Sequence, residues 1–438
     1  MVMSHEEQEL LVRTNPGTPM GEVFRRYWQP AFLSERLPEP DCPPIAIKLL
    51  GEHLVAFRDT KGRLAIMDEA CPHRGASLSY GRCEEDGIRC IYHGWKLDVN
   101  GTVVEAPPEK NPREFGRKIK HTSYPVHEAG GIVWVYMGPP EKMPEFPKWR
   151  FCNIPESHIL PVHYLQECNY LQAVEGDIDA AHASYLHLDL EAYRERHNRT
   201  PSPVDFTAFF GFDRAPAGAT VDTDWGFDSV WRMNIEDEEN PGQIKPDLDA
   251  LIVHPFIAPA NSIVAGGGAL GPYIWHAWVP VDDTHHILYY VHYLVDEPMS
   301  EELRKEVIRY FGHHKVHKDD DYRPWGNREN RHLQDREFQR DTSFSGIDGI
   351  ACQDIAVTQS QGFIVDRTKE HLGAEDVGVT RIRKTLLRAV KAVHEGGDPP
   401  MGRAEEYARV DGYVAPVPKG TPWQEVTRDK MADKGILA

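Results

Sequence analysis

The sequence predicts an α+β protein in which a small antiparallel β domain precedes a larger domain of mixed structure. Between about residues 44 and 137 the apolar residues form short runs bounded by turn residues. An example is "HLVAFRD" and "RLAIMDE" around Thr60-Lys61-Gly62, which is a hairpin pattern. After a proline-rich stretch at residues 138–149, helical and extended patterns occur together. A chain of 438 residues has room for two or three domains.

The predicted elements follow one another along the chain. Residues 6–27 read as two short helical pieces broken by Asn15-Pro16-Gly17. Longer helices are predicted from Leu171 to Leu186 and from Gly378 to His394, the second with its apolar residues on one face. A further helix, "SEELRKEVIRYFG", begins at a capping serine, Ser300. The remaining extended runs are "GGIVWVYMG", "SIVAGGG", "YIWHAWVPV" and "HHILYYVHYLV". We therefore expect an N-terminal helical segment at residues 1–43, the β domain at 44–145 and the second domain at 146–438.

The charge and the cysteines narrow the class of protein. The formal net charge of −19 argues against a nucleic-acid-binding protein, which needs a basic surface to neutralise phosphates. The seven cysteines are an odd number spread unevenly, which makes a poor disulfide framework and suits a reducing compartment. The first residues show no signal-peptide pattern, and no apolar run approaches the roughly 18–20 residues of a membrane span. We expect a cytoplasmic protein that binds neither nucleic acid nor membrane.

Residues 71–95, "CPHRGASLSYGRCEEDGIRCIYHGW", contain two mixed pairs of metal-binding side chains, Cys71-x-His73 and Cys90-x2-His93. A structural zinc site usually pairs like with like, two cysteines and then two histidines. Mixed pairs suit a [2Fe–2S] cluster in which one iron takes two thiolates and the other takes two imidazoles. We therefore predict that Cys71, His73, Cys90 and His93 bind such a cluster, and that Cys83 is not a ligand.

A second set of metal-binding side chains lies in "NYLQAVEGDIDAAHASYLH", residues 169–187. On a regular helix Asp179 and His182 share a face, whereas His187 lies about 140° round from His182. The helix must therefore distort or end between His182 and His187 for both imidazoles to reach one metal, and taken alone such a pair is more often structural. Asp354, in "QDIAVTQSQG", would complete a two-histidine, one-carboxylate triad for ferrous iron, with positions open for dioxygen.

These motifs resemble those of one enzyme family over nearly the whole chain. "CPHRGASL", "CIYHGWKLD", the "LQ-x2-EG-x2-D-x2-H-x4-H" pattern and "QD…SQG-x-I-x-DRT" are similar to the oxygenase (alpha) subunit of the Rieske non-heme iron aromatic ring-hydroxylating oxygenases, in the phthalate-dioxygenase-like branch. The resemblance implies an N-terminal all-β Rieske [2Fe–2S] domain followed by a helix-grip (START-like) catalytic domain, with an antiparallel sheet around a long helix. It also implies a mononuclear Fe(II) bound by His182, His187 and Asp354.

The same resemblance implies roles for three residues near the triad. Asp179 would not be a ligand. It would connect a histidine ligand of the cluster in one subunit to an iron-binding histidine of the neighbouring subunit, and we expect His93 and His182 to be its two contacts. Asn169 and Glu175 are the other residues expected to take part in catalysis. The assembly would be a homotrimer or a stacked hexamer.

The implied activity is that of the oxygenase component of a multicomponent system. It would use O2 and electrons from NAD(P)H to hydroxylate a small aromatic compound, with a substituted aromatic acid as the first expectation. "GGGALG" at residues 266–271 matches a dinucleotide-binding fingerprint, but a strand rather than a helix is predicted to follow it. Electrons must then come through a separate reductase of the flavin or ferredoxin type. The alternatives are an aryl methyl ether O-demethylating monooxygenase and a non-catalytic Rieske electron carrier.

One position bears on the substrate. After Gly226-Phe227 the chain has Asp228, where phthalate-acting relatives have an arginine that could bind a carboxylate through two hydrogen bonds. An aspartate facing the substrate would repel a carboxylate, so phthalate itself is a doubtful substrate on this reasoning. Arg232 or Arg214 could take over the role.

Two further groups have alternative interpretations. His313, His314 and His317 could bind a metal, but the charged residues around them favour a solvated connection. Trp231, Trp275 and Trp278 could line an aromatic pocket or pack the sheet.

Overall fold

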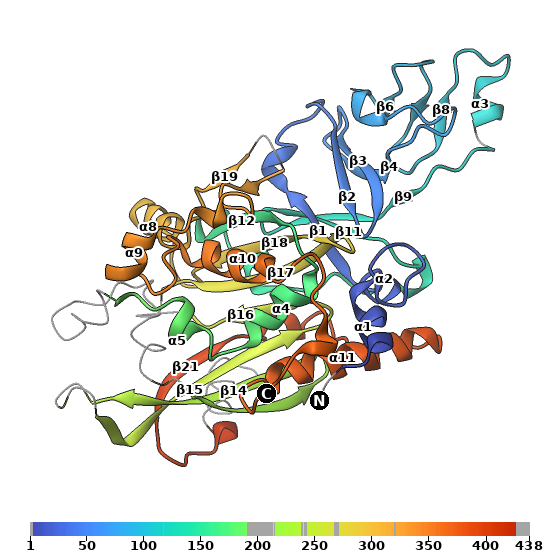
Figure 1. Ribbon diagram of the computed structural model, residues 1–438. Coiled ribbons are helices and arrows are strands. Elements are labelled where there is room, and N and C mark those ends of the chain that lie inside the picture. Colours follow the sequence, from blue (N-terminus) through green and yellow to red (C-terminus); the bar gives the residue numbers. More distant parts are fainter. Residues whose placement is uncertain are drawn as a thin grey trace. The chain divides into compact units, whose positions relative to one another are not determined.

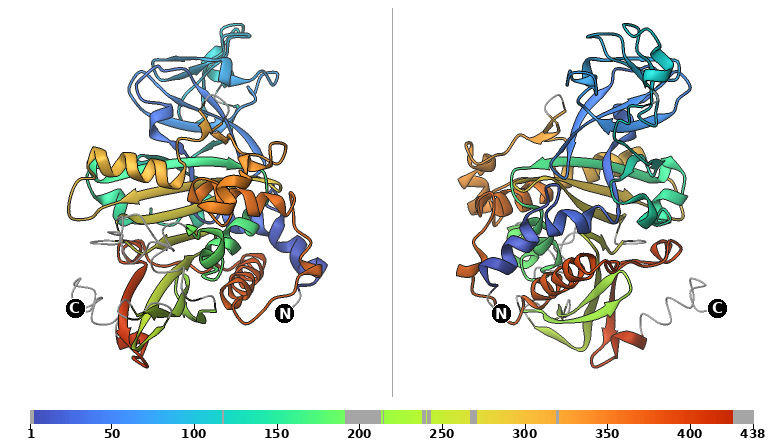
Figure 2. Two further views of the ribbon diagram at one scale, coloured as in Figure 1. Left: turned by 60° about the vertical axis from the view of Figure 1, so that its left-hand side comes forward. Right: turned by 90° about the vertical axis from the view of Figure 1, so that its right-hand side faces the viewer.

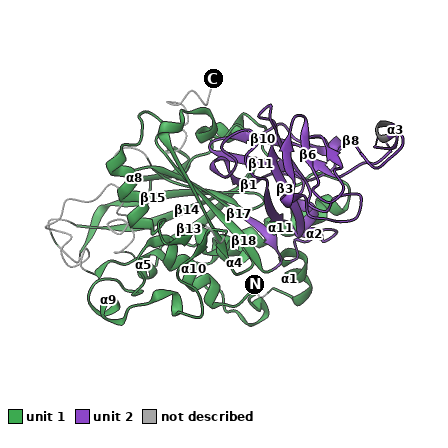
Figure 3. Ribbon diagram, turned by 90° about the horizontal axis from the view of Figure 1, so that it is seen from above, with its two compact units in different colours: residues 1–12, 147–278, 284–438 green, residues 13–146, 279–283 purple. Residues whose placement is uncertain are grey.

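The computed structural model describes residues 3–116, 118–190, 213, 215–237, 240, 243–266, 271–318 and 321–425. The chain forms two compact units, shown in different colours in Figure 3. Unit 1 comprises Met1–Val12, Pro147–Trp278 and Thr284–Ala438, and unit 2 comprises Arg13–Phe146 and Val279–Asp283. The helical segment predicted at the N-terminus is therefore divided between the two units.

Unit 2 consists mainly of three small antiparallel sheets. The β3–β4 hairpin turns through Asp59-Thr60-Lys61-Gly62, and Asp59 Oδ1 accepts the backbone N–H of Lys61 and of Arg63. These side-chain bonds stabilise the turn that the sequence predicts. The sheets are β1 (Trp28–Leu33), β11 (Ile132–Tyr136) and β10 (Val126–Ala129); β2 (Ile45–Leu49), β3 (Glu52–Arg58), β4 (Leu64–Asp68) and β9 (Ser123–Tyr124); and β5 (Arg82–Glu84), β6 (Gly87–Arg89), β7 (Lys96–Leu97) and β8 (Val103–Glu105). The helices are α2 (Pro19–Phe24) and α3 (Pro112–Gly116).

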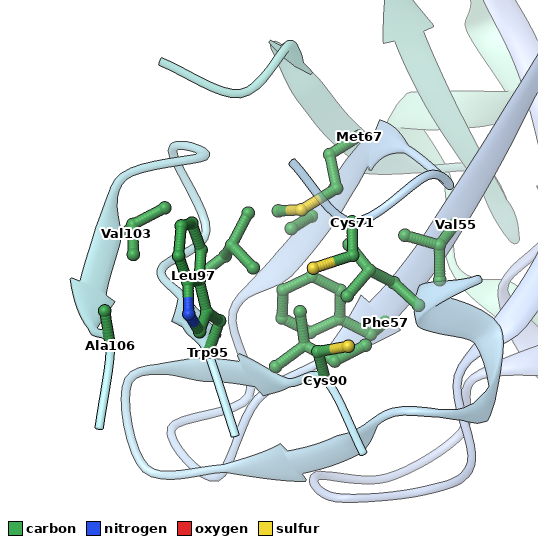
Figure 4. Packing of buried hydrophobic residues seen from close by; sticks show 12 residues of the cluster. Val55, Phe57, Met67, Cys71, Cys90, Trp95, Leu97, Val103 and Ala106 are labelled. Carbon is green, nitrogen blue, oxygen red and sulfur yellow. The ribbon is translucent and has the colours of Figure 1, made fainter. Parts of the chain in front are cut away.

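The core of this unit lies between the two four-stranded sheets. Val55 and Phe57 lie on one face of β3, and Leu54 and Ala56, on the other face, are buried as well. Val55 and Phe57 pack with Met67 of β4 and with Trp95 in a cluster that also contains the thiols of Cys71 and Cys90 (Figure 4). The two cysteines of the predicted cluster site are therefore part of the buried core of the unit.

Unit 1 is built on an eight-stranded sheet with the order β12-β18-β17-β16-β15-β14-β13, and β21 also pairs with β15 (Figure 1). The pairings of β12 with β18, of β16 with β17, and of β15 with β14, β16 and β21 are antiparallel. The strands are β12 (Ile159–Gln166), β13 (Ala217–Thr223), β14 (Gly226–Glu236), β15 (Ile244–Ile257), β16 (Asn261–Val264), β17 (Tyr273–Asp282), β18 (His285–Tyr293) and β21 (Tyr413–Pro418).

The long helix α11 (Val377–His394) packs against β13, α1 and α4 (Figure 2). Its buried residues Ile382, Leu386 and Val390 follow the helical period, so one apolar stripe holds it in place. A sheet with a long helix packed on it is the arrangement that the sequence predicts. The other elements of unit 1 are α1 (His5–Val12), α4 (Tyr170–Ile178), α5 (Ala183–Leu186), α8 (Glu301–Phe311), α9 (Arg336–Asp341), α10 (Ile350–Ser360) and the hairpin β19 (Val316–His317) and β20 (Arg323–Pro324).

The helix predicted from Leu171 to Leu186 is interrupted. α4 ends at Ile178, because Asp179 is extended and its Oδ1 accepts the backbone N–H of Ala181. Such a local turn competes with the helical hydrogen bonds. The expectation that Asp179 and His182 share a helix face is therefore wrong. The break expected between His182 and His187 falls instead before His182, and both histidines cap the single short helix α5.

The glycine-rich stretch at residues 266–271 falls mostly outside the described residues, because residues 267–270 are not described. On either side of it β16 and β17 pair, with Val264 opposite Ile274. A strand therefore follows the stretch, as predicted. In the described part of the chain, none of the helices has the length and apolarity that crossing a membrane requires.

Candidate active site

The three residues of the predicted triad lie together in unit 1. His182 and His187 are the two caps of the short helix α5, and Asp354 lies on α10. The Nε2 atoms of His182 and His187 are 3.8 Å and 3.3 Å from Asp354 Oδ1. One donor atom from each residue lies within 4.8 Å of the other two, so a single metal ion could be bound by all three.

Hydrogen bonds orient both imidazoles. His187 Nδ1 lies 2.7 Å from Gln353 Oε1, and His182 Nδ1 is hydrogen-bonded to the backbone oxygen of Asp179. Because both partners are acceptors, each Nδ1 carries the hydrogen and each Nε2 keeps its lone pair for a metal. Gln353 is a functional residue that the sequence analysis missed, although it directly precedes Asp354.

The electrostatics of the triad favour a cation. Burial lowers the pKa of His187, but Asp354 and the hydrogen bond that His187 donates to Gln353 together raise it above its ordinary value. The negative charge of Asp354, which favours the protonated form of His187, also favours a metal cation bound at the same place. Two imidazoles and one carboxylate are the donor set of ferrous oxygenase sites, so the residues present fit the predicted iron.

The triad opens into a cavity of about 510 Å³, and every residue that lines it belongs to unit 1. Its apolar wall suits an aromatic ring, and the volume is in the range of small-molecule sites. This wall includes Trp231, Ile252, Ile274, Trp278 and Leu288. Trp231 and Trp278 thus line the pocket, whereas Trp275 is fully buried and packs against Trp149 and Phe151.

Asp179 lies beside the triad. Its Oδ2 atom is 3.7 Å from His182 Nδ1, and its side chain is 24% exposed. The carboxylate is therefore close to one histidine of the predicted triad, is partly exposed, and lines the same cavity.

Asn169 is at a different place. It is fully buried at the N-cap of α4, where its Oδ1 accepts the N–H of Leu171 and its Nδ2 donates to the backbone oxygen of Val12. It is not among the described residues that line the cavity. The structure gives it the contacts of a capping residue.

Glu175 lines the cavity but is held by two arginines. Arg367 donates to Glu175 Oε2 at 2.8 Å, and Arg383 donates to Oε1 at 2.7 Å and also to Glu370 at 2.9 Å. Burial alone would raise the pKa of Glu175, but the two guanidinium groups hold it below its ordinary value. This buried network joins α4 to α11 and to the segment before it.

The predicted cluster ligands lie on two loops of unit 2 with the same backbone pattern. Cys71 donates its N–H to Ala76, and Gly75 donates to Cys71, both at 2.8 Å. In the second loop Cys90 donates to Trp95 at 2.8 Å and Gly94 donates to Cys90 at 3.0 Å. Gly75 and Gly94 have φ of 73° and 74°, which favours glycine at the fourth position after each cysteine.

The side chains of these loops converge. The ring centroids of His73 and His93 are 4.4 Å apart, and Trp95 stacks on His73 at 4.6 Å. Both cysteines are buried, whereas both histidines are partly exposed. The loops therefore bring two thiols to the inside and two imidazoles to the outside of one site.

The chemistry of this donor set fits a [2Fe–2S] group. Burial raises the pKa of the Cys71 thiol to about 11, and the neighbouring Cys90 thiol adds to the rise. Both sulfurs can therefore be ionised together only with a cationic centre beside them. Desolvation, His73 and Arg74 each lower the pKa of His93, which favours the neutral imidazole that binds metals. Cys83, in β5, packs against the buried hydrophobic core of unit 2.

The interpretation of His313 as part of a solvated connection is wrong. His313 is buried; its Nδ1 is hydrogen-bonded to the hydroxyl of Tyr164, and its Nε2 lies 2.7 Å from Nε2 of His292. Gly312, with φ of 79°, ends α8 and turns the chain inward at this point. His314 and His317 are exposed, as expected for a solvated segment.

Asp228 does not face the cavity, contrary to the expectation from the sequence. Trp231 lines the cavity, and side chains alternate along a strand, so Asp228, three positions earlier on β14, projects from the opposite face. Asp228 therefore does not face a substrate in this cavity. Arg232 shares the face of Asp228 and pairs with Asp249 at 3.6 Å, and Arg214 lies outside the described residues.

Comparison with known proteins places these two sites in one family. The model of the Rieske [2Fe-2S] domain matches residues 27–125, and that of the LigXa C-terminal domain like family matches residues 135–436. The phthalate 4,5-dioxygenase oxygenase subunit of Pseudomonas putida is 36% identical over 97% of this chain and 94% of its own length. The chain belongs to the Rieske non-heme iron oxygenases.

Further relatives agree with the phthalate-dioxygenase-like branch of these oxygenases. The 3-chlorobenzoate-3,4-dioxygenase oxygenase subunit of Comamonas testosteroni is 34% identical over 97% of this chain and 98% of its own length. The 5,5'-dehydrodivanillate O-demethylase oxygenase subunit of Sphingobium sp. is 29% identical over 91% and 83%. A solved complex of oxygenase and ferredoxin in carbazole 1,9a-dioxygenase has a TM-score of 0.54 at 20% identity over 84% and 90%, and confirms the fold.

The predicted family, fold class and enzyme class are thereby confirmed. As a Rieske oxygenase, the chain is the oxygenase subunit of a multicomponent oxidoreductase. It carries a Rieske [2Fe–2S] domain and a non-heme iron domain, and electrons from NADH arrive through a reductase.

Proposed function

We propose that this oxygenase subunit hydroxylates a small aromatic acid at an iron bound by His182, His187 and Asp354. The observation that carries the proposal is the convergence of two Nε2 atoms and one carboxylate oxygen on a cavity with a largely apolar wall. When bound there, iron would activate dioxygen for transfer to the substrate. The protein contributes by orienting the ligands through Gln353 and Asp179, and by enclosing the ring between Trp231 and the strands β17 and β18.

We infer that Cys71, His73, Cys90 and His93 hold the [2Fe–2S] cluster. The support is the matched pair of loops, with the thiols inside and the imidazoles outside. Asp179 would then bridge His93 of a neighbouring subunit and His182 by hydrogen bonds, and so connect the cluster of that subunit to the iron for electron transfer. This role requires a homotrimer, or two stacked trimers, and its support in this chain is the partial exposure of Asp179 beside His182.

The substrate class follows from the shape of the cavity and from the relatives. Two relatives are named for phthalate and 3-chlorobenzoate, which are both aromatic acids. A third is named for an O-demethylase, and an aryl methyl ether acid would use the same iron, ring pocket and electron supply. Hydroxylation of an aromatic acid is the first proposal and demethylation of its methyl ether is the second.

The redox partner would be a flavin-containing reductase that acts directly or through a ferredoxin. One oxygenase of the same fold has been solved in complex with its ferredoxin. We place the enzyme in the cytoplasm, because all seven of its cysteines are free of disulfides.

The test uses reduced protein, ¹⁸O-labelled dioxygen, and a panel of benzoates and methoxybenzoates, with products identified by mass spectrometry. Two labelled oxygens in a dihydrodiol identify a dioxygenase, and formaldehyde with a phenol identifies a demethylase. About three irons and two sulfides per chain are expected, and His182→Ala should lower iron to about two and abolish product without changing the Rieske spectrum. Unlabelled or absent product throughout the panel would refute the proposal.

A further inference from the structure

A second polar group lies on the wall of the cavity, and no step described above uses it. Asp177 projects from α4 between two histidines of the sheet. Its Oδ1 is 2.8 Å from Nδ1 of His276 on β17, and its Oδ2 is 3.2 Å from Nε2 of His254 on β15. We call these three residues the Asp177 cluster. All of them line the same cavity as the iron triad.

The register of the sheet explains why the two histidines meet one carboxylate. Ser262 of β16 pairs with His276 on one side and with Phe256 of β15 on the other. His254 is two positions before Phe256, and therefore projects from the same face. α4 packs against β16 between them, so a side chain from this helix can reach both neighbouring strands.

The cluster is deeply buried. The side chains of Asp177 and His276 are 10% and 7% exposed. Burial would raise the pKa of Asp177, but His254 and His276 hold it well below its ordinary range. A buried carboxylate is costly unless it is paired, so the two imidazoles are needed to keep it ionised.

Three atoms of this cluster are buried and form no hydrogen bond within the described residues: Asp177 Oδ2 and His254 Nε2, which face each other at 3.2 Å, and His276 Nε2, which the ion pair with Asp177 does not use. The ring of His276 is held in place by Asp177 on one side and by edge-to-face contacts with Tyr290, at 4.3 Å, and Trp278, at 5.5 Å. Most buried polar atoms in proteins are hydrogen-bonded. A ligand in the cavity could therefore supply the missing hydrogen-bond partner of His276 Nε2.

The charges of the cavity indicate which ligand. Arg383 is the one lysine or arginine among the described residues that line it, and its guanidinium is bonded to Glu175 and Glu370. This guanidinium is therefore already paired, and the imidazoles of the Asp177 cluster are groups on the wall of the same cavity that can offer an N–H to an anionic substrate.

We propose that His276 and His254, positioned by Asp177, bind the carboxylate of the aromatic substrate, with His276 Nε2–H as a donor. This inference rests on the function proposed above and adds the residues that select the acid. Tyr290, which contacts the ring of His276, also lines this cavity, so the proposed carboxylate site and the iron triad share one cavity. A substrate bound in this way presents the far side of its ring to the iron.

The test compares the binding of benzoate and methyl benzoate to the anaerobic holoenzyme by calorimetry. The two probes share a ring and differ in charge. Wild type should bind benzoate more tightly than the ester. His276→Leu should weaken benzoate about 10- to 100-fold, the range of a charged hydrogen bond, and change the ester less than about threefold. Asp177→Asn should lower the same acid-to-ester ratio, and His276→Gln should weaken benzoate to an intermediate degree.

The matched control is His286→Gln. His286 is a fully buried histidine of β18 that donates to the backbone of Cys168 and is not among the described residues that line the cavity. Its replacement should leave the acid-to-ester ratio unchanged. The Rieske spectrum and the iron content show which variants are folded and loaded.

The outcomes separate this inference from the proposed function. If the enzyme oxidises aromatic acids but the His276 and Asp177 variants keep the wild-type acid-to-ester ratio, the carboxylate site is wrong and the function stands. If benzoate binding depends on His276 but no labelled product forms, the site stands and the function fails. Equal affinity of wild type for acid and ester would overturn the inference outright.

Discussion

Oε1 of Gln353 lies 2.7 Å from Nδ1 of His187, while the next residue along the chain, Asp354, approaches the opposite side of the same imidazole at 3.3 Å. Two consecutive residues of α10 therefore set both the tautomer and the position of one ligand. Gln353 is itself fixed, because its amide donates to the backbone oxygen of Ile347 at 2.8 Å.

The first prediction concerns this support. Gln353→Leu removes the acceptor, so the His187 ring can rotate and lose its preferred tautomer. We expect iron affinity at the triad to fall about 10- to 100-fold, as for other residues that orient metal ligands. Iron content after dialysis against a chelator is the measurement. Ser360→Ala, at the exposed end of the same helix, is the control and should retain iron.

The second prediction concerns electron delivery. Asp179→Asn keeps the backbone oxygen that holds His182 but removes the charge beside it. We expect a normal Rieske spectrum and normal iron content, with a much slower rate of cluster oxidation in single-turnover mixing with substrate and dioxygen. A rate equal to that of wild type would remove the connecting role of Asp179.

The third prediction separates a catalytic from a structural Glu175. Glu175→Gln leaves Arg367 and Arg383 without their shared counter-charge in a buried place. Breaking a buried ion pair in this way costs about 3–5 kcal/mol. We expect a clear fall in the melting temperature, with activity per bound iron largely kept; Glu405→Gln, an exposed partner of Lys148, should change neither. A stable but inactive variant would restore the catalytic interpretation.

The fourth prediction is a pH dependence. Burial raises the pKa of Asp228 from 3.8 to about 6. The folded state therefore binds the proton of Asp228 more tightly than the unfolded chain does. The stabilisation that this protonation gives is complete below pH 3.8 and is lost as the pH rises through about 6. About two pKa units correspond to about 3 kcal/mol. Asp228→Asn should raise the melting temperature at pH 8 and give little gain at pH 4.5; an equal gain at both values would contradict it.

Most of the proposed metal ligands could be suspected from the sequence because members of each pair are close along the chain, with Asp354 the exception. Cys71 and His73, or Cys90 and His93, share one tight loop, and His182 and His187 share one helical turn. Gln353 could have been suspected only from its place beside Asp354. The Asp177 cluster could not be found in this way, because it combines α4, β15 and β17, and only the pairing register brings His254 and His276 to one face.

The errors have a common physical cause. His313 was expected to be solvated because charged residues follow it, but a left-handed glycine directly before it turns the ring into the core. Asp228 lies on the face of β14 away from the cavity, because the register of the whole strand, and not the residues next to Asp228, decides which face a side chain takes. In both cases the neighbours in sequence were a poor guide to the surroundings in space.

The two metal sites differ in how much of the chain must exist before they can form. The proposed cluster ligands fall within residues 71–93, inside the continuous segment Arg13–Phe146 of unit 2. The proposed iron ligands extend from His182 to Asp354, and the strands β14 to β18, which contribute to the cavity wall, lie between them. During synthesis on the ribosome, the cluster ligands are therefore all present while the iron site still lacks Asp354. We expect iron–sulfur assembly to be able to begin on the nascent chain, whereas mononuclear iron has to wait until α10 has emerged.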